Sequence, residues 1–301
     1  NNGDGADVMN GGAGRDRAEV NGARDGDVFS VTTDGAEVDF ARTNLGQFTL
    51  DIAETEVLRI KGRAGDDTMS GAEDEGLGDL VKLDMRGGLG ADQLTGSDGE
   101  DVLRGGKGAD ELVGFQGDDK VLGGRGQDTL IWNNGDGSDL MNGGGGRADT
   151  VQVNGADGAG DSFVIDGAGR GVSLARDNLG EFELDIRKTE ILEVNGQGGD
   201  DAITAANLAG EIALKVDGGA GADAIAGADG DDLISGGAGD GANDVLTGGA
   251  GADTFVFAGD FGVDTVTDFA IGEDLLEVQT TGALDTAQKL VDALAQTDDD
   301  V

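Results

Sequence analysis

Aspartate recurs every nine residues between residues 87 and 131, at the sixth place of a pattern that reads G-G-x-G-x-D-x-U-x, where U is apolar. The five successive units are GGLGADQLT, GSDGEDVLR, GGKGADELV, GFQGDDKVL and GGRGQDTLI. Carboxylate and carbonyl oxygens are the ligands that the hard cation Ca²⁺ prefers. The pattern therefore predicts repeated calcium sites, and their charged ligands would be Asp92, Asp101, Asp110, Asp119 and Asp128.

The glycines of each unit suit the same chemistry. Glycine tolerates a positive φ and lets the backbone come close to an ion, so G-G-x-G predicts a turn whose carbonyl oxygens point at the cation. Ser97 and Phe115 replace the second glycine, which should affect the turn conformation more than the supply of a carbonyl. The predicted carbonyl ligands are Gly88, Gly90, Gly99, Gly106, Gly108, Gly117, Gly124 and Gly126.

The apolar residue at the eighth place predicts how the turns are held. A short strand follows each turn, and its eighth residue should point into the body of a solenoid. If two units form one coil, alternate units stack on the same edge. Asp92, Asp110 and Asp128 would then line one edge, and Asp101 and Asp119 the other. The predicted interior residues are Leu94, Leu103, Leu112, Val121 and Leu130.

A second array follows at residues 218–256, with the units GGAGADAIA, GADGDDLIS, GGAGDGANDVLT and GGAGADTFV. Isolated turns of the same type lie outside both arrays. The predicted ligands in the second array are Asp223, Asp232, Asp244 and Asp253, with Gly219, Gly221, Gly230, Gly237, Gly249 and Gly251. In the isolated turns they are Asp7, Asp16, Asp67, Asp139, Asp149 and Asp201.

A longer duplication encloses the short repeat. NNGDGADVMNGGAGR at residue 1 matches NNGDGSDLMNGGGGR at residue 133, and ARTNLGQFTLDI at 41 matches ARDNLGEFELDI at 175. Each copy contains a glycine-poor stretch, 28–60 or 162–194, in which apolar and polar residues alternate as in strands with one wet face. We therefore divide the chain into a first unit at 1–132, a second at 133–257 and a capping segment at 258–301.

The capping segment differs in composition from the arrays. Its longer strands begin at FVFAGDFGVDTVTDF, and Asp264, Asp268 and Asp274 are candidates for one further ion. A short helix with Asp285 as its N-cap is predicted next, as a solenoid cap or else a partner-binding helix. Its apolar positions are Leu284, Ala287, Leu290, Val291 and Leu294. The predicted fold is all-β: a parallel β-roll or β-solenoid with two glycine-poor β inserts and a short C-terminal helix cap.

Composition excludes several classes of function. The 301 residues include 60 glycines but no proline, cysteine, histidine or tyrosine, and the net charge is −42. Without His or Cys, a zinc site of the usual ligands, a Ser-His-Asp triad and a thiol nucleophile are excluded. The charge argues against nucleic acid or an anionic membrane as partner. No apolar run reaches the roughly 18 residues of a membrane helix. We also expect the chain to be a piece of a longer protein.

The same charge predicts a folding switch. Stacked turns lie about 4.8 Å apart, so neighbouring carboxylates repel by on the order of 3 kcal/mol at an effective dielectric near 20. The thin apolar content cannot offset this repulsion together with the loss of backbone entropy. Calcium between the turns would reverse the repulsion, so we expect a chain that is largely disordered without calcium and ordered with it.

These motifs resemble the RTX, or haemolysin-type calcium-binding, repeats of proteins exported by bacterial type I secretion. The stretch GADTFVF…DTVTDF…GEDLLEV resembles the segment that follows such repeats in serralysin-like proteases. The resemblance implies a parallel β-roll, calcium held by sixth-place aspartates and glycine carbonyls, export in an unfolded state, and folding outside the cell. We expect a secreted or cell-surface protein in which this module supports secretion and stability, with the type I secretion machinery as a partner of the parent protein.

Three other interpretations stay open. A disordered Gly-Asp linker would lack the regular apolar eighth place. A calcium-dependent polysaccharide lyase or epimerase could use Arg42, Arg176, Glu54 or Glu190, although arginines in turns usually form surface ion pairs. A surface-layer or adhesin-type segment could bind extracellular glycan or neighbouring copies through the duplicated stretches. We expect a non-enzymatic module, with any catalysis in other parts of the parent protein.

Overall fold

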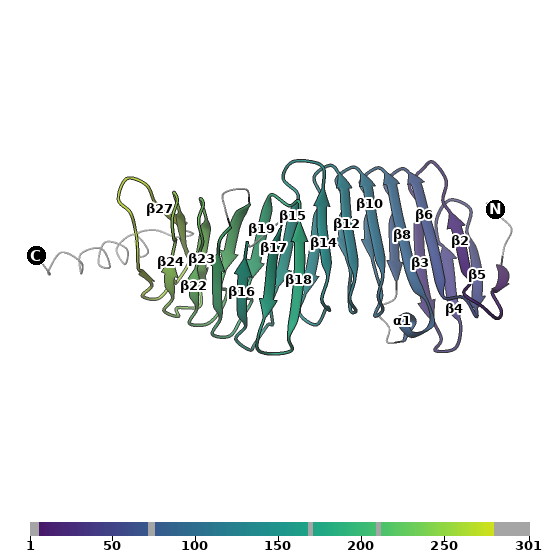
Figure 1. Ribbon diagram of the computed structural model, residues 1–301, viewed down its shortest axis with the longest axis horizontal. Helices are drawn as coiled ribbons and strands as arrows, with labels where there is room; N and C mark the ends of the chain where they lie inside the picture. Colours follow the sequence, from purple (N-terminus) through teal and green to yellow (C-terminus); the bar gives the residue numbers. More distant parts are fainter. Residues whose placement is uncertain (1–5, 72–75, 168–170, 209–211, 280–301) are drawn as a thin grey trace, which may run out of the picture. The chain divides into compact units, whose positions relative to one another are not determined.

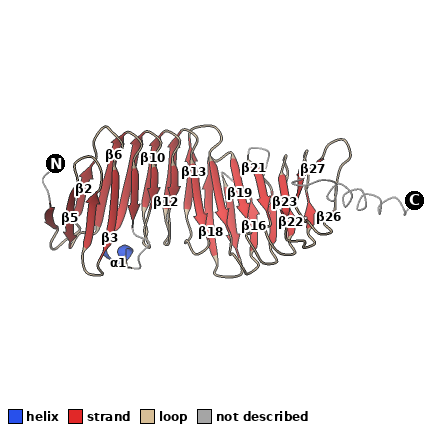
Figure 2. Cartoon of the chain, turned by 180° about the vertical axis from the view of Figure 1, so that it is seen from behind, coloured by secondary structure: helices blue, strands red, loops and turns tan. Residues whose placement is uncertain are grey.

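The computed structural model describes residues 6–71, 76–167, 171–208 and 212–279, and nearly every element in them is a β-strand (Figures 1 and 2). One short helix, α1 (Leu77–Leu80), interrupts the strands. The mostly β fold with parallel sheets is therefore confirmed. The predicted helix around residues 284–294 lies outside the described residues.

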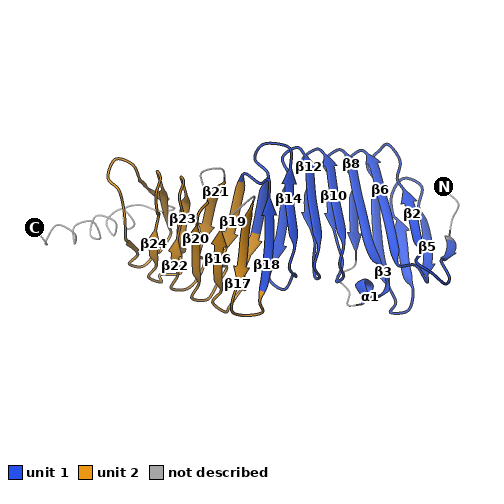
Figure 3. Ribbon diagram, viewed as in Figure 1, with its two compact units in different colours: residues 1–152, 182–190 blue, residues 153–181, 191–301 orange. Residues whose placement is uncertain are grey.

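Contacts divide the chain into two compact units (Figure 3). Unit 1 comprises Asn1–Gln152 with Phe182–Glu190, and unit 2 comprises Val153–Glu181 with Ile191–Val301. This division follows spatial contacts, whereas the division proposed from the sequence follows the internal duplication. The second glycine-poor stretch, 162–194, is shared between the two units.

Unit 1 contains two sheets, and successive strands of the first array alternate between them. Within the array, paired strands are offset by one coil of 18 residues: Val102 on one strand is the partner of Lys120 on the next. Two nonapeptides thus form one coil, as predicted. One sheet has the order β1 (Ala6–Asn10), β5 (Phe48–Ala53), β4 (Val38–Arg42), β3 (Val28–Thr33), β7 (Thr68–Gly71), β9 (Gln93–Thr95), β11 (Glu111–Val113), β13 (Thr129–Asn133). The other has β2 (Arg17–Asn21), β6 (Val57–Ala64), β8 (Lys82–Leu89), β10 (Val102–Lys107), β12 (Lys120–Arg125), β14 (Leu140–Gly144), β18 (Phe182–Arg187).

Unit 2 repeats the two-sheet plan, and β15 (Thr150–Asn154) crosses the boundary between the units. In the second array the expanded unit lengthens one coil, so that Ala224 pairs with Val245. Its sheets have the orders β19 (Ile191–Asn195), β21 (Ala213–Asp217), β23 (Leu233–Ala238), β25 (Thr254–Ala258), β27 (Leu275–Gln279) and β17 (Val172–Arg176), β16 (Ser162–Asp166), β20 (Ala202–Ala206), β22 (Ala224–Ala226), β24 (Val245–Thr247), β26 (Thr265–Val266).

The core consists of inward-facing residues from successive strands. Strand burial alternates, because neighbouring side chains in a strand point to opposite faces. The five eighth-place residues Leu94, Leu103, Leu112, Val121 and Leu130 are all buried, which confirms the prediction.

The glycine-poor stretches form antiparallel strands inside otherwise parallel sheets. In the first, β3 pairs antiparallel with β4, and β4 with β5, while β5 and β3 pair in parallel with β1 and β7. Phe29 and Phe40 pack behind them with ring centroids 5.4 Å apart. In the second, β16 and β17 form an antiparallel hairpin in unit 2, and β18 pairs in parallel with β14 in unit 1. Both stretches therefore continue the stack as sheet strands, as their alternating pattern predicted.

Candidate metal-binding turns

The sixth-place aspartates of the first array form two hydrogen-bonded rows, which we call the aspartate ladders. The backbone N–H of each aspartate donates to Oδ1 of the aspartate one coil further along. The N···O distances are 2.9 Å from Asp92 to Asp110, 3.1 Å from Asp110 to Asp128 and 2.7 Å from Asp101 to Asp119. Alternate units thus share an edge, as predicted.

The second carboxylate oxygen of the ladder aspartates, Oδ2, indicates a cation site. Except in Asp101, Oδ2 of these aspartates is buried and receives no hydrogen bond. A buried acceptor without a donor costs free energy. The aspartates with such an Oδ2 are Asp16, Asp67, Asp92, Asp110, Asp119, Asp128, Asp139, Asp149, Asp201 and Asp223. A positive ion beside these oxygens would compensate their charge, so the donor set fits calcium.

First-place glycines make room for that oxygen. A Cβ added to Gly87 would lie 2.1 Å from Oδ2 of Asp92, and one added to Gly105 would lie 2.3 Å from Oδ2 of Asp110. Neither distance is compatible with a side chain. The first glycine of each unit is therefore required by close approach of the carboxylate.

Second- and fourth-place residues form the left-handed turn that the sequence predicted. The fourth-place carbonyl faces the neighbouring coil, because a Cβ on Gly108 would lie 1.7 Å from the Gly90 oxygen. Phe115 has a φ of 70°, so this side chain accepts the conformation that glycine normally supplies. Positive φ is found at Gly88, Gly90, Gly106, Gly108, Gly117, Gly124, Gly126, Gly219, Gly221, Gly230, Gly237, Gly249 and Gly251.

The turn that contains Ser97 differs from the others. The N–H and hydroxyl of Ser97 both donate to Oδ2 of Asp101 at 2.7 Å, so this carboxylate has partners where the others have none. Gly99, which lacks a positive φ, packs its backbone against Gly78 of α1, and a Cβ on Gly99 would lie 2.5 Å from the Gly78 Cα. The turn at Ser97 thus differs, as expected, whereas Phe115 keeps the positive φ of the turn, so the expected change of conformation is wrong there.

Burial raises the pKa of the ladder aspartates. The pKa is raised to about 6 for Asp92, Asp110 and Asp128, to about 7 for Asp67, and to about 9 for Asp119. Loss of solvation is the main cause, and repulsion from neighbouring carboxylates adds to it. The folded turns therefore disfavour the ionised form of these carboxylates, which a bound cation would favour.

Unit 2 contains ladders of the same type. One runs from Asp161 through Asp201, Asp223 and Asp244 to Asp264, with N···O distances of 2.6 to 3.0 Å. The other joins Asp232 to Asp253 and Asp253 to Asp274, each at 3.0 Å. The three aspartates proposed to share an ion beyond the array do not form one cluster, although Asp268 and Asp274 both lie near Asp253. Asp264 and Asp274 end different ladders, and Asp268 accepts the N–H groups of Gly248 and Gly249.

The isolated turns take different places. Asp67 joins the first-array ladder by donating its N–H to Oδ1 of Asp92 at 2.9 Å, and it accepts the N–H of Asp27. Asp139 and Asp149 accept the N–H groups of Asp119 and Asp128 at 2.8 and 3.0 Å. Asp16 is half-buried and donates its N–H to Oε2 of Glu56 at 2.6 Å. Asp7 is exposed on β1.

Glutamates, which the pattern does not count as ligands, replace aspartate at two ladder positions. Besides Glu56, Glu190 accepts the N–H of Asp149 through Oε2 at 2.9 Å. Each glutamate lies at the end of a glycine-poor stretch, where the nonapeptide frame is lost. The equivalence of EVLRIKG at 56 and EILEVNG at 190 is the sequence signal that pairs them.

Asp27 and Asp161 are ladder residues that the pattern also missed. Both are fully buried; Asp27 is the sixth residue of GARDGD, and Asp161 is the seventh residue of GADGAGD. Arg42 pairs with Oδ1 of Asp27 at 2.5 Å, and Arg176 pairs with Oδ1 of Asp161 at 2.9 Å. Because both arginines are also buried, the expectation of surface ion pairs is wrong.

Aspartate doublets supply a further set of oxygens. The fifth-place Asp66, Asp118, Asp200 and Asp231 each precede a ladder aspartate and accept an N–H from the next coil at 2.8 to 3.0 Å. The sequence signal is the dipeptide Asp-Asp after glycine. Within the described ranges no three acidic side chains converge on one point. An ion held at these turns would therefore need backbone carbonyls as well as carboxylates.

Comparison with protein families agrees with this geometry. The model of the RTX calcium-binding nonapeptide repeat matches residues 3–19, 59–75, 84–112, 95–130, 215–241 and 239–266. These ranges include both arrays and the turns at Asp16 and Asp67. A search of curated proteins finds no relative that matches the chain. Among the described residues, no helix has the length and apolar character needed to cross a membrane.

Proposed function

Because the chain carries RTX calcium-binding nonapeptide repeats in parallel β-roll sheets with aspartate ladders, we propose that it is a calcium-triggered folding and stabilising module of a secreted protein. One observation carries the proposal: the Oδ2 atoms of Asp92, Asp110 and Asp128 are buried on one edge without a hydrogen-bond donor. A protein that evolved to keep such turns without a counterion would carry a repeated energetic cost.

The chain's own residues assemble the proposed calcium sites. The ladder N–H to Oδ1 bonds align the carboxylates along each edge, and the first-place glycines let Oδ2 approach the backbone. Oδ2 of the ladder aspartates and the carbonyls of second- and fourth-place glycines would hold calcium. Bound calcium supplies the positive charge that these oxygens lack. Binding free energy then adds to folding free energy, because the unfolded chain has no assembled site.

The wider biological setting is part of the proposal. Dependence on calcium would keep the chain unfolded where calcium is scarce and fold it after export, in keeping with the type I secretion class that the repeats resemble. The described part of the segment after Thr254 supports a serralysin-like cap, since β26 and β27 extend the two sheets of unit 2. The proposal assigns catalysis to other parts of the parent protein.

A calcium titration followed by far-ultraviolet circular dichroism tests the proposal. We expect a cooperative change from coil to β structure with calcium and none with magnesium, because Mg²⁺ requires a tighter octahedral set of ligands. The variant Asp110→Asn should need more calcium. Its matched control is Glu111→Gln, which removes a neighbouring exposed carboxylate that lies outside the ladder. Full β structure in excess chelator would refute the proposed function.

A further inference from the structure

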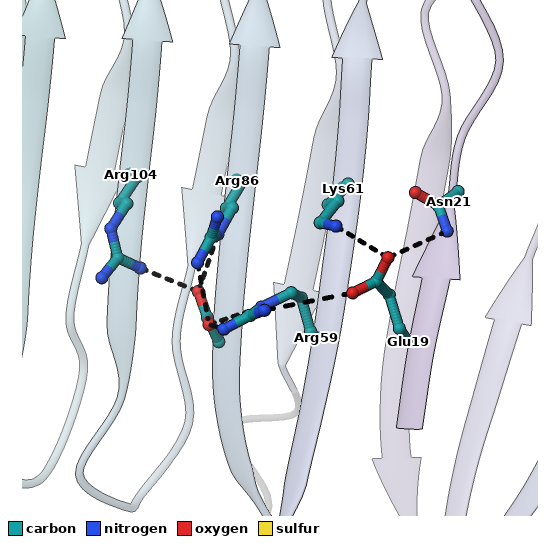
Figure 4. Close-up of polar contacts among 7 residues, drawn as sticks. Glu19, Asn21, Arg59, Lys61, Arg86 and Arg104 are labelled. Atoms are coloured by element: carbon teal, nitrogen blue, oxygen red, sulfur yellow. Dashed lines mark hydrogen bonds and ion pairs between the residues drawn. The ribbon is translucent and has the colours of Figure 1, made fainter. Parts of the chain in front are cut away.

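Unit 1 carries a cluster of basic side chains on the outer surface of one sheet, which the calcium sites do not explain. We name this cluster the cationic face; it consists of Arg59 and Lys61 on β6, Arg86 on β8 and Arg104 on β10 (Figure 4). Strand register places Lys61, Arg86 and Arg104 in one row across three adjacent strands. Neighbouring strands are about 4.8 Å apart, so the row presents regularly spaced positive charge.

Acidic partners within the face do not cancel this charge. Arg59, Arg86 and Arg104 all contact the single carboxylate of Asp84, with an N···O distance of 2.8 Å from Arg104. Lys61 pairs with Glu19 at 2.7 Å. Four basic groups therefore meet two acidic ones. Burial raises the pKa of Asp84, but hydrogen bonds from Arg86 and Arg59 outweigh this, so the pKa lies below its ordinary value and Asp84 is ionised at neutral pH.

The cationic side chains remain accessible from solvent. Their exposed fractions range from 18% for Arg59 to 39% for Arg86. One carboxylate cannot satisfy three guanidinium groups, because each of these has five N–H donors. The cationic face can therefore offer donors to a ligand while Asp84 keeps the arginines in place.

The internal duplication shows that the fold does not require these cations. EVLRIKG at 56–62 corresponds to EILEVNG at 190–196, so Arg59 and Lys61 are replaced by Glu193 and Asn195 on β19. The second copy thus builds an equivalent parallel strand with the opposite charge. In unit 1 the strands β7, β9 and β11 of the other sheet contain no lysine or arginine. Four of the chain's 20 lysines and arginines thus gather on one surface of a chain whose net charge is −42.

From this placement we propose that the cationic face binds a linear polysaccharide that carries carboxylates. Guanidinium groups bind carboxylates through paired, charge-assisted hydrogen bonds, and a row of them across a sheet fits a ligand with charges along one axis. The occupant must be less densely charged than nucleic acid, because the rest of the chain repels a polyanion over the distance of the Debye length. A sugar polymer with one carboxylate on each sugar meets both conditions.

Binding to the calcium-loaded full chain tests this proposal by isothermal titration calorimetry. The probe is an oligogalacturonate of defined length, too short to gel with calcium, and its methyl ester is the uncharged control ligand. We expect the acid to bind, the ester not to bind, and the affinity to fall as sodium chloride is added. Equal binding of acid and ester would overturn the proposal, as would absence of binding at low salt.

Paired variants locate the site. Arg86→Gln with Arg104→Gln should weaken binding by about tenfold, the effect of losing two exposed charge contacts. Neutral residues are tolerated in this row, since Leu122 and Asn142 occupy it on β12 and β14. The control, Arg24→Gln with Lys215→Gln, removes the same charge elsewhere and should change affinity by less than about twofold.

Separate readouts distinguish this proposal from the calcium proposal. Circular dichroism should show that both pairs of variants fold with calcium as the wild type does. If the double variant at the cationic face failed to fold, the acid and ester arms with the wild type would still decide the proposal. Unchanged affinity in a folded Arg86→Gln, Arg104→Gln variant would overturn it. So would light scattering that showed a dimer of the wild type and a monomer of the Arg86→Gln, Arg104→Gln variant.

Discussion

Two kinds of turn hold the same ladder aspartate in different ways. In the first array, Oδ2 of Asp92, Asp110 and Asp128 is buried without a donor. At the turns that open the glycine-poor stretches, Asp27 and Asp161 face the buried guanidinium groups of Arg42 and Arg176. A side chain thus supplies the positive charge in one kind of turn, whereas in the array we expect it to come from bound calcium.

We expect the dependence of folding on metal to reside in the turns that have no arginine partner. Arg42 follows Asp27 by 15 residues and Arg176 follows Asp161 by 15 residues, and both arginines come from the second strand of an antiparallel hairpin. The hairpin brings the chain back to the ladder, where its arginine side chain pairs with the aspartate. A plain nonapeptide has no such excursion and therefore no guanidinium group at its turn, so we expect a bound ion or a proton to neutralise it.

The largest effect is expected at the arginine-paired turns. Arg42→Met should lower the free energy of unfolding by about 3–5 kcal/mol in saturating calcium, because Asp27 would stay buried without its partner. Urea unfolding measures the change. Adding Asp27→Asn to this variant should restore part of the loss. A loss below about 1 kcal/mol for Arg42→Met would contradict the assigned role.

A smaller effect, with a sign that depends on metal, is expected in the array. Asp110→Asn should cost about 1–3 kcal/mol in calcium, because one charged ladder acceptor is lost. In chelator the same variant should have more β structure than the wild type, since one uncompensated charge is gone. Arg42→Met should have less. Finding the two variants alike in chelator would remove the distinction between the two kinds of turn.

Acid should partly replace calcium in the array. The folded-state pKa is raised to about 6 for Asp92 and about 7 for Asp67, above the ordinary value of 3.8. Groups shifted in this direction favour the folded state at low pH, and the benefit disappears as pH rises through the folded pKa. Circular dichroism in chelator should therefore show β structure increasing from pH 8 to pH 5. A decrease over that range would contradict the pKa assignment.

The smallest effect concerns the second place of the repeat. Gln197 and Phe115 have φ values of 73° and 70°, in the region that favours glycine. Gln197→Gly should stabilise the calcium-loaded protein by about 0.5 kcal/mol, because relief of left-handed strain exceeds the entropic cost of glycine. Thermal unfolding measures the shift, and Gly219→Ala, at a glycine with a φ of 97°, should act in the opposite direction.

Sequence periodicity predicted the burial and the stacking that depend on contacts between adjacent coils. The burial of Leu103 and Val121 and the shared edge of Asp92 and Asp110 follow from a period of nine residues with two units per coil. These features are repeated and local, so a pattern is sufficient. The assignment of ladder aspartates as calcium ligands remains a prediction.

Features that depend on the path between coils were not predictable. The contacts of Arg42 with Asp27 and of Asp16 with Glu56 join residues 15 and 40 positions apart, across strands whose direction the alternating pattern does not specify. The cationic face was missed for the same reason. Arg86 and Arg104 are adjacent only through strand register. The overall charge of −42 does not predict a local positive surface.

The direction of the ladder bonds makes the two ends of a stack unequal. Each amide donates to a carboxylate that comes later in the chain, as Asp92 does to Asp110 and Asp110 to Asp128. Deleting a coil at the C-terminal side removes an acceptor and leaves a buried N–H of the remaining coil without a hydrogen bond. Trimming from the N-terminal side removes only a donor and leaves a carboxylate that water can reach. A coil is thus completed by its successor, and the stack should tolerate shortening at its beginning better than at its end.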